Sequence, residues 1–323
     1  MRLALLALAL FTGCVDPDAP VRPGDDTPFV FEVPKGSTAG GLGPVMVSEG
    51  LAPSELQWKL FLRGEDASCL KAGRFEVRRS MSMHEVLATL CGAPLSDDVP
   101  FTVVEGWRIR DIDAALTAKG WIEAGSYKAL AESKGVDLPF AVTSPTLEGY
   151  LYPETYAVSA RSFSAERLIE RQLQTFKERF LDTHRGEVDK GRGLHAIVVM
   201  ASMLEREEPS PTNRPLVAGI LWKRVDRGWQ LGVDATSRYD LPEWNDRAAF
   251  LRNLRDETHP YNTRHLKGLP PTAIGNPTVS SLEASLRPTP SEYWFYLHDA
   301  QGVLHPSRNG DEHDALRRKY DVW

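Results

Sequence analysis

Apolar and polar residues alternate in two stretches of the chain, and each stretch ends at a glycine that precedes a helical pattern. The two stretches are Phe31-Glu-Val-Pro-Lys-Gly36 and Phe101-Thr-Val-Val-Glu-Gly106, which lie 70 residues apart. Matching pairs at the same offset are Gly50 and Gly120, and Leu60 and Leu130. Alternation with a period of two indicates a strand, and the apolar spacing of three or four that follows indicates a helix. The pattern therefore predicts two copies of a unit with the order strand, turn, helix, loop, helix.

Between these copies the pattern predicts one more strand and a capped helix. Residues 74–78 alternate as a strand, and Ser82 with Glu85 three residues on predicts the start of a helix over residues 83–90. Residues 146–156 hold three Tyr and two Glu around one Gly and one Pro. Proline disfavours a regular helix there, so this segment is expected to be an aromatic loop or edge.

The C-terminal half has the spacing of long helices. Apolar residues recur with helical spacing over residues 162–181, and a polar linker over 182–193 leads to a strongly apolar helix over 194–208. Nearly all of the residues in the middle of that last helix are apolar. Such a helix is buried over most of its circumference.

Small repeated strand-and-helix units of this kind resemble LysM-like modules, which lie on glycan chains. A duplication that serves packing alone would leave the same pattern. We expect an α+β fold with a LysM-like module over residues 28–99, a second strand-helix repeat unit over 100–143 and a mixed α/β domain over 144–323. At roughly 100 to 200 residues per domain, the length of 323 residues agrees with two or three folded units.

The composition is that of an ordinary globular protein. Hydrophobic residues make up 42 % of the chain and charged residues 25 %, which excludes a disordered protein, a coiled coil and a polytopic membrane protein. The net charge is −6, so no overall positive field attracts nucleic acid. We therefore expect no nucleic-acid partner.

The N-terminus, MRLALLALALFTGC, has the form of an export signal. The apolar run Leu3 to Phe11 spans only about half of a ~30 Å hydrocarbon core, so a permanent membrane helix is physically short. Small residues before Cys14 resemble a bacterial lipobox, in which the cysteine is lipidated, although Phe11 departs from the usual Leu. We expect a signal peptide over residues 1–13, a lipid on Cys14 and a flexible tether over 14–27; ordinary secretion or a retained anchor are the alternatives.

If Cys14 carries a lipid, an even pair of cysteines remains. In an oxidising compartment Cys69 and Cys91 are expected to form a disulfide, the alternative being two buried free thiols. No Cys-x-x-Cys spacing occurs. The sequence therefore gives no support to a thiolate zinc site.

Four charged residues follow the apolar part of the helix over 194–208. At about 100° per residue, Glu205 and Glu208 continue the buried stripe that begins at Ile197, whereas Arg206 and Glu207 leave it. A carboxyl group on the buried stripe is partly desolvated, which disfavours its charged form and suits a general acid. The alternative is a frayed, solvated helix end before the next proline.

Several boxes in the C-terminal part resemble the YceG-like (MltG) family of lytic transglycosylases, which cut peptidoglycan strands. Leu147-Glu-Gly-Tyr-Leu-Tyr-Pro-Glu-Thr-Tyr156 looks like the family's LEG-aromatic-PDTY box, and Ala201-Ser-Met-Leu-Glu-Arg-Glu207 is similar to its AS-apolar-apolar-EKE box. The runs Leu231-Gly-Val-Asp-Ala-Thr236 and Tyr261-Asn-Thr263 with Gly268-Leu-Pro-Pro271 look like two further boxes. The resemblance covers roughly residues 28–323.

The chain departs from the family pattern at several positions. These are Lys223, Gly232, Ala235, Arg264, Thr272 and Thr278, where the family usually has Asn, Gln, Pro, Tyr, Gly and Gly. A terminal histidine box is also altered near His305 and His313. The box that holds the acid is intact.

The resemblance implies a catalytic role for Glu205 and substrate contacts around it. Tyr150 and Tyr152 would offer stacking faces to sugar rings, and Tyr261 and Asn262 would stabilise the transition state. Asp234 lies in a box near the site and is a further candidate for substrate binding. The family also implies endolytic cutting of nascent strands beside cell-wall synthases, on the periplasmic side of the cell envelope.

Two other functions stay open. If Asp234 faced Glu205, the pair could run a hydrolysis, as in a muramidase. A glycan-binding lipoprotein without catalysis would use the LysM-like modules alone. A metal enzyme built on His305, Asp311 and His313 is disfavoured, because HPSRNGDEH reads as a loop broken by Gly and Pro and lacks H-E-x-x-H spacing. We expect neither metal nor cofactor.

Overall fold

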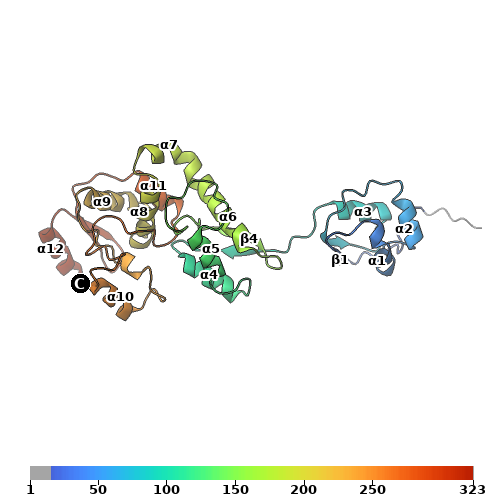
Figure 1. The fold of residues 1–323 in the computed structure, drawn as a ribbon, viewed down its shortest axis with the longest axis horizontal. Coiled ribbons are helices and arrows are strands. Elements are labelled where there is room, and N and C mark those ends of the chain that lie inside the picture. The colour runs from blue at the N-terminus through green and yellow to red at the C-terminus, as the bar shows by residue number, and fades with distance from the viewer. Residues whose placement is uncertain (1–15, 323) are drawn as a thin grey trace, which may run out of the picture. The chain divides into compact units, whose positions relative to one another are not determined.

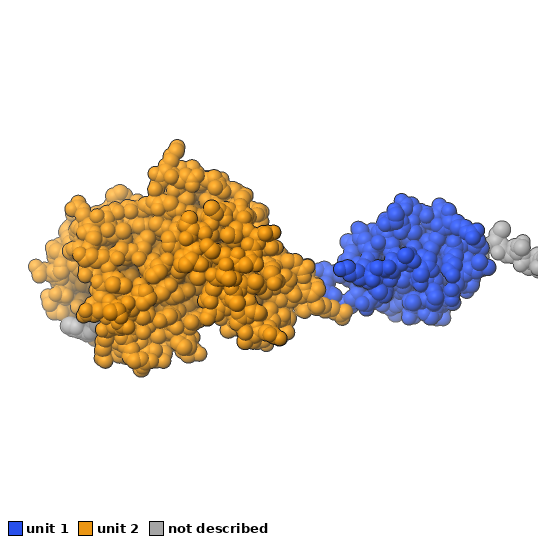
Figure 2. Space-filling view, in the orientation of Figure 1, with its two compact units in different colours: residues 1–97 blue, residues 98–323 orange. Residues whose placement is uncertain are grey.

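The computed structural model describes residues 16–322, so Cys14 and the export signal lie outside the described residues. The chain forms two compact units, one ending at Asp97 and one beginning at Asp98 (Figures 1 and 2). Residues 98–143 therefore share a unit with all that follows them. Within residues 16–322, no helix has both the length and the apolar character needed to cross a membrane.

Over residues 16–97 the first unit contains two strands and three α-helices. In chain order its elements are β1 (Phe29–Val33), the short 3₁₀-helix η1 (Gly40–Leu42), α1 (Gly43–Ser48), α2 (Glu55–Phe61), β2 (Gly73–Val77) and α3 (Met83–Cys91). β1 and β2 pair in antiparallel register, with Phe31 opposite Phe75. Ser82 and Glu85 form the expected capping box at the start of α3.

The second unit contains four strands and nine α-helices among the described residues. It begins with β3 (Asp98–Thr102), α4 (Ile109–Ala118), α5 (Ser126–Ser133), β4 (Thr155–Ser159) and α6 (Ala165–Phe176). It continues with the π-helical turn η2 (Lys177–Leu181), α7 (Asp182–Lys190), α8 (Leu194–Glu207), α9 (Arg214–Asp226), the 3₁₀-helix η3 (Thr236–Arg238) and α10 (Arg247–Arg255). It ends with α11 (Val279–Leu286), β5 (Phe295–His298), β6 (Leu304–Ser307) and α12 (Gly310–Tyr320).

The two predicted repeats have the same order of elements. The first runs β1-α1-α2-β2-α3 and the second runs β3-α4-α5-β4-α6, and in each the two strands pair antiparallel. Phe31 and Phe101 occupy matching buried positions on the first strands. The second copy is longer between its second helix and second strand, where the aromatic segment 146–156 is inserted. We refer to these as the first and second βααβα copies.

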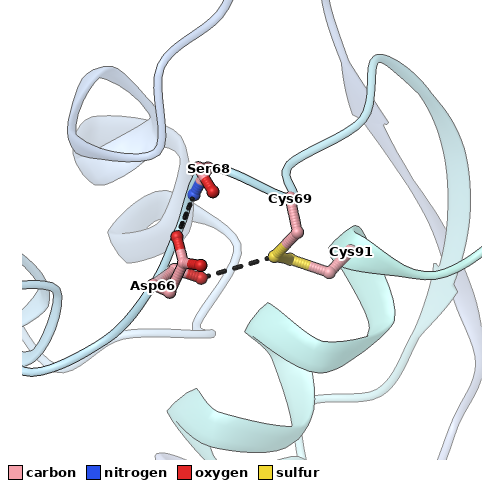
Figure 3. Close-up of a disulfide and its surroundings, with 4 residues drawn as sticks. All are labelled: Asp66, Ser68, Cys69 and Cys91. Atoms are coloured by element: carbon pink, nitrogen blue, oxygen red, sulfur yellow. Dashed lines mark hydrogen bonds between the residues drawn. A yellow bond between two sulfur atoms is a disulfide. The ribbon is translucent and has the colours of Figure 1, made fainter.

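The first unit has its own core and a covalent link. Trp58 is fully buried at its centre, and its indole nitrogen donates to the carbonyl of Ala39 over 2.8 Å. Cys69 and Cys91 form the disulfide that the sequence predicts, with Cα atoms 5.0 Å apart, at the C-terminal end of α3 (Figure 3).

The segment expected to be a free tether lies against the first unit. The carbonyl of Pro17 accepts from the backbone of Met83, and the carbonyl of Asp25 accepts from Ser80. Asp18 and Glu65 both contact the ring of His84, over 2.8 and 3.0 Å. The prediction of a flexible tether is therefore wrong for residues 17–25, because backbone hydrogen bonds and an ion pair hold this polar segment in place.

The polar linker predicted over residues 182–193 is mostly the helix α7. His184 and Val188, four residues apart, are buried and give this polar helix its one apolar face. Glu187 pairs with Arg287, which follows α11. The prediction failed because two inward residues carry little periodic signal in a window of charged ones.

The C-terminal segment is also more regular than expected. β5 and β6 form an antiparallel hairpin, and α12 starts after Asn309, whose side chain caps the helix at Glu312. Residues 305–313 therefore form the end of a strand and the start of a helix rather than a loop. Within this segment His305 pairs with Asp299, while His313 lies near Ser307.

Candidate active site

The C-terminal end of α8 carries three glutamates that turn to different surroundings. α8 packs against α11 and α9 through a face that is buried along almost its full length. Glu208, which follows its last turn, is fully buried, and the side chain of Glu205 is 7 % exposed. The predicted buried stripe is therefore present. Glu207 is half-buried on another side of the helix.

Glu205 accepts four hydrogen bonds from three residues. Its Oε2 accepts from the backbone N–H of Thr278 at 2.8 Å, the hydroxyl of Thr278 at 2.7 Å and the hydroxyl of Ser281 at 2.8 Å. Its Oε1 accepts from Arg214 Nη2 at 3.0 Å. Thr278 is the N-cap of α11, so the carboxyl group lies at the positive end of that helix.

Arg214 ties the surroundings of Glu205 together. It is buried, and besides Glu205 it donates to the backbone carbonyl of Glu208 over 3.0 Å and to the hydroxyl of Thr278 over 3.2 Å. A buried carboxylate is costly unless it is paired and hydrogen-bonded, and Arg214 supplies that pairing. The rotamer of Glu205 is thus fixed from two sides.

Asn276 joins the loop before α11 to two distant segments. Its side-chain oxygen accepts from the backbone of Gly149 at 3.0 Å and of Leu151 at 2.9 Å, and its side-chain nitrogen donates to the carbonyl of Trp107 at 2.8 Å. It is fully buried. Asn276 therefore fixes both the 146–156 segment and the turn of the second βααβα copy against the loop that holds Thr278.

Two glycines make this close approach possible. Gly149 has φ +90°, and a Cβ there would lie 2.5 Å from the Cβ of Ala273 and 2.6 Å from Val198. Gly275 has φ +153°, and a Cβ there would lie 2.3 Å from the carbonyl oxygen of Gly106. Only glycine fits either position without displacing the backbone or α8.

Glu148 is a second buried carboxyl group, and it lies at the start of α4. It is 1 % exposed, and its oxygens accept from the backbone of Ile109 at 3.2 and 3.1 Å and from the Tyr239 hydroxyl at 3.0 Å. Burial raises the pKa of Glu148 to about 8, although these hydrogen bonds favour its carboxylate form. Glu148 therefore holds the start of α4 and Tyr239 together.

The two tyrosines expected to stack on sugars are in the core. Tyr150 is 1 % exposed, and its ring contacts Phe140 and Phe176 with centroids 6.3 and 5.6 Å away. Tyr152 is also buried, and its hydroxyl interacts with the backbone of Val279, next to the residue that binds Glu205. The stacking prediction is therefore wrong for both rings, because no face is open to a ligand. Tyr152 instead holds the backbone at the start of α11, where Thr278 binds Glu205.

Tyr261 and Asn262 hold the loops around the site. The Tyr261 ring lies against Tyr239, with centroids 4.6 Å apart, and its hydroxyl bonds to Thr272 over 2.8 Å. Asn262 is fully buried, and its side-chain nitrogen donates to the carbonyls of Asn253, Leu254 and Asp256 at the end of α10. Asn262 therefore positions a loop. The sequence led us to expect a contact with the substrate, but its buried side chain is not available for one.

Asp234 is placed near Glu207 and contacts an arginine. Its carboxylate accepts from Arg264 Nε at 2.6 Å, and both side chains are exposed. Burial, and then the charge of Asp234, raises the pKa of Glu207. The hydroxyl of Tyr296 donates to Glu207 over 3.3 Å. The structure thus brings Asp234 together with Glu207 and Arg264, while Glu205 is bound by Arg214 and α11.

Sequence reasoning missed the residues that hold Glu205. Arg214, Thr278 and Ser281 lie 9, 73 and 76 residues from it in the chain. Thr278 appeared only as a departure from a family pattern. The one local signal at Arg214 is the proline that follows it, a residue typical of the first turn of a helix.

The surroundings of Glu205 suit a group that gains and loses a proton. Arg214 and the backbone N–H of Thr278 can only donate, so they stabilise the carboxylate. The hydroxyls of Thr278 and Ser281 can either donate or accept, so each can turn to accept from a protonated Glu205. The site can therefore hold both protonation states of one carboxyl group without a large rearrangement.

Comparison with known proteins gives a consistent result. A sequence profile of the YceG-like family matches residues 31–319. A Bacillus subtilis (strain 168) protein named endolytic murein transglycosylase is 25 % identical over 316 residues, which are 93 % of this chain and 87 % of that protein. Two Streptococcus pneumoniae proteins of the same name are 23 % identical over 97 % of this chain, which spans 62 % of their length. A crystal structure of a YceG-like protein from Listeria monocytogenes has the same fold, with a TM-score of 0.59, 23 % identity, and coverage of 90 % of this chain and 99 % of that one.

Proposed function

The chain belongs to the YceG-like family, and we propose that it is an endolytic lytic transglycosylase of peptidoglycan in which Glu205 is the single catalytic acid and base. Relatives named endolytic murein transglycosylase match more than nine-tenths of its length. The reaction breaks the bond between C1 of N-acetylmuramic acid and O4 of N-acetylglucosamine without water. It serves the assembly of the cell wall.

The observation that carries this proposal is the set of hydrogen-bond donors around one carboxyl group, that of Glu205. Glu205 is bound by Arg214 and by two hydroxyls at the start of α11, whereas Asp234, the other candidate carboxyl group, is exposed and pairs with Arg264. A hydrolase needs two carboxyl groups, one of them to activate water or attack the sugar. A lytic transglycosylase needs one, because its substrate supplies the nucleophile.

The proposed reaction has two proton transfers. Protonated Glu205 gives its proton to O4 of the leaving N-acetylglucosamine as the C1–O4 bond breaks, which leaves Glu205 as carboxylate. The C6 hydroxyl of the same N-acetylmuramic acid then bonds to C1 and closes a 1,6-anhydro ring. Its proton passes to Glu205, which is restored. Arg214 and the backbone N–H of Thr278 stabilise the carboxylate between these steps.

Replacing Glu205 by Gln tests this role. Gln keeps the shape and hydrogen-bonding capacity of Glu205 but cannot give up and take back a proton, so cleavage of purified peptidoglycan should fall by several orders of magnitude. Binding of the glycan should persist. Glu208→Gln and Glu207→Gln are controls on the same helix end, and a loss confined to either of them would move the catalytic role away from Glu205.

The runner-up activity is a hydrolysis that uses Asp234. Asp234→Asn should cost much less activity than Glu205→Gln, because Asp234 pairs with Arg264. Equal losses in the two variants, together with products that have reducing ends, would favour a muramidase. Absence of cleavage by the wild type under all conditions would favour a glycan-binding protein.

We further propose how the chain is attached and what its first unit does. A lipid on Cys14 anchors it to the membrane on the periplasmic side, beside cell-wall synthases, and the first unit lies on glycan as a LysM-like module. The basis is the sequence before Cys14 and the β-α-α-β order of the unit. Intact-mass measurement of the native protein tests the anchor: residues retained before Cys14 without an acyl chain would contradict it.

A further inference from the structure

Three aromatic rings meet at the surface of the second unit, in a position that the proposed reaction does not use. Trp229 is 43 % exposed, and its ring centroid is 4.7 Å from that of Trp294 and 5.9 Å from that of Phe295. The rings are tilted by 54° and 60° to Trp229, so its face is not stacked against either neighbour. Among residues 16–322, Trp229 is the one Trp, Tyr or Phe side chain that is exposed.

Cationic side chains surround these rings. The Lys223 ammonium lies 4.6 Å from the Trp294 ring centroid, and the Arg224 guanidinium lies 5.2 Å from that of Phe295. Arg227 and Lys267 are exposed nearby, Arg227 two residues before Trp229 and Lys267 bridged to Gln230. We call Trp229, Trp294 and Phe295 the aromatic platform. It combines an apolar face with positive charge at its edge.

Two segments that carry the platform also contact other parts of the second unit. The bridge between Gln230 and Lys267 joins it to the loop 260–271, which lines a cavity of about 310 Å³. Trp294 is two residues before Tyr296, so their Cα atoms are roughly 7 Å apart. The Tyr296 hydroxyl reaches Glu207, two residues from Glu205. The platform and Glu205 therefore belong to the same unit and are linked through Tyr296 and the end of α8.

We propose that the aromatic platform is an outlying binding site for the glycan strand, where an N-acetylhexosamine ring stacks on Trp229. This inference rests on the proposed function for the identity of the ligand. Sugar rings have apolar C–H faces that suit indole, and the carboxylates of peptides attached to the strand suit Arg227 and Lys267. The site would favour long strands, because only they reach from Glu205 to the platform.

Fluorine NMR of the full chain labelled with 5-fluorotryptophan tests this directly. The chain has eight tryptophans, and the Trp229 signal is assigned by its loss in Trp229→Phe. We expect titration with chitohexaose, a neutral N-acetylglucosamine oligomer, to shift the Trp229 signal to saturation. Trp294→Ala should weaken the affinity read at Trp229 roughly three- to tenfold, and Leu138→Ala, an exposed apolar control, should not.

Each other outcome would overturn the proposal. Shifts at other tryptophans with none at Trp229 would place the sugar elsewhere, and a Trp229 shift that follows protein concentration would indicate self-association. Arg227→Gln should weaken binding of strands that carry peptides and leave chitohexaose binding unchanged. An equal effect on both ligands would contradict the claim that Arg227 binds the peptide carboxylates. Because these readouts need no cleavage, failure of the platform and failure of the catalytic proposal are distinguishable.

Discussion

The two βααβα copies share an order of elements but differ at the turn after the first strand. In the first copy, a Cβ at Gly36 would meet open space, and Leu42, the N-cap of α1, makes no side-chain capping bond. In the second copy, a Cβ at Gly106 would lie 3.1 Å from Arg206, the residue after Glu205. The start of α4 there is held by buried Arg108, which bonds to two backbone carbonyls on either side of Asp240.

The difference shows how one backbone arrangement serves two purposes. The first copy closes on its own core and is linked by a disulfide. The second copy receives Glu148, Asn276 and Arg206 from segments inserted into it or following it, and these groups fasten it to α8 and α11. The turn that only reverses the chain in the first copy is thereby bonded, in the second copy, to Arg206 and Asn276 beside the candidate site.

The largest effect expected to distinguish the two copies is the pH dependence that Glu148 gives to the stability of the second copy. Its pKa is about 8 in the folded chain against 4.5 in the unfolded chain. The folded state therefore keeps a proton that the unfolded state loses, and the stability this provides is complete below pH 4.5 and declines as pH rises toward 8. The decline is on the order of 5 kcal/mol. Glu148→Gln has no proton to lose, so its unfolding temperature should fall less steeply between pH 5 and pH 8 than that of the wild type.

Glu132→Gln is the matched control, because Glu132 is an exposed residue of α5 in the same copy. It should unfold with the pH profile of the wild type. If Glu148→Gln also kept that profile, the buried proton would play no part in stability and the second copy would be no more dependent on pH than the first.

The next effect concerns the covalent link of the first copy. Replacing Cys69 and Cys91 by Ser should destabilise the first unit by about 3 kcal/mol on a chain-entropy estimate. Cleavage by the second unit should be unchanged on a short glycan. Denaturant unfolding followed at the two units separately would show this, and an equal loss in the second unit would mean that the copies fold as one.

The matched turn glycines give the smallest effect and the most specific one. Gly36→Ala and Gly106→Ala each place Ala at positive φ, at a cost of roughly 1 to 2 kcal/mol. Only Gly106→Ala also crowds Arg206, which must shift by a few tenths of an ångström and is adjacent to Glu205 on α8, so we expect turnover to fall more in Gly106→Ala than in Gly36→Ala. Equal turnover in the two folded variants would contradict the assignment of the second turn to the active site.

Local features of the fold were predictable from the sequence, and contacts between distant segments were not. The capping box at Ser82, the extent of α8 and the repeated strands depend on neighbouring residues, so their patterns are visible in the chain. The order of elements in the second copy was only partly visible, because the inserted segment separates α5 from β4.

The candidate site divides in the same way. Helical geometry placed both Glu205 and Glu208 on the buried stripe, and only the family resemblance singled out Glu205. The partners of Glu205, Thr278 and Ser281, come from the start of another helix. Tyr150 and Tyr152 were expected at the surface because aromatic loops often bind sugars, yet the loop is fastened inward by Asn276 from more than a hundred residues away. Because contacts with distant segments decide whether these side chains are buried, the neighbouring sequence carries no pattern that predicts it.

The ends of the fragments released by the wild-type chain test the central claim most directly. If Glu205 alone is acid and base, mass spectrometry of fragments from purified peptidoglycan will find ends in 1,6-anhydro-N-acetylmuramic acid, one water lighter than a reducing end, and Glu205→Gln will release none. Fragments with full-mass reducing ends would contradict the account, because a second group would then have activated water.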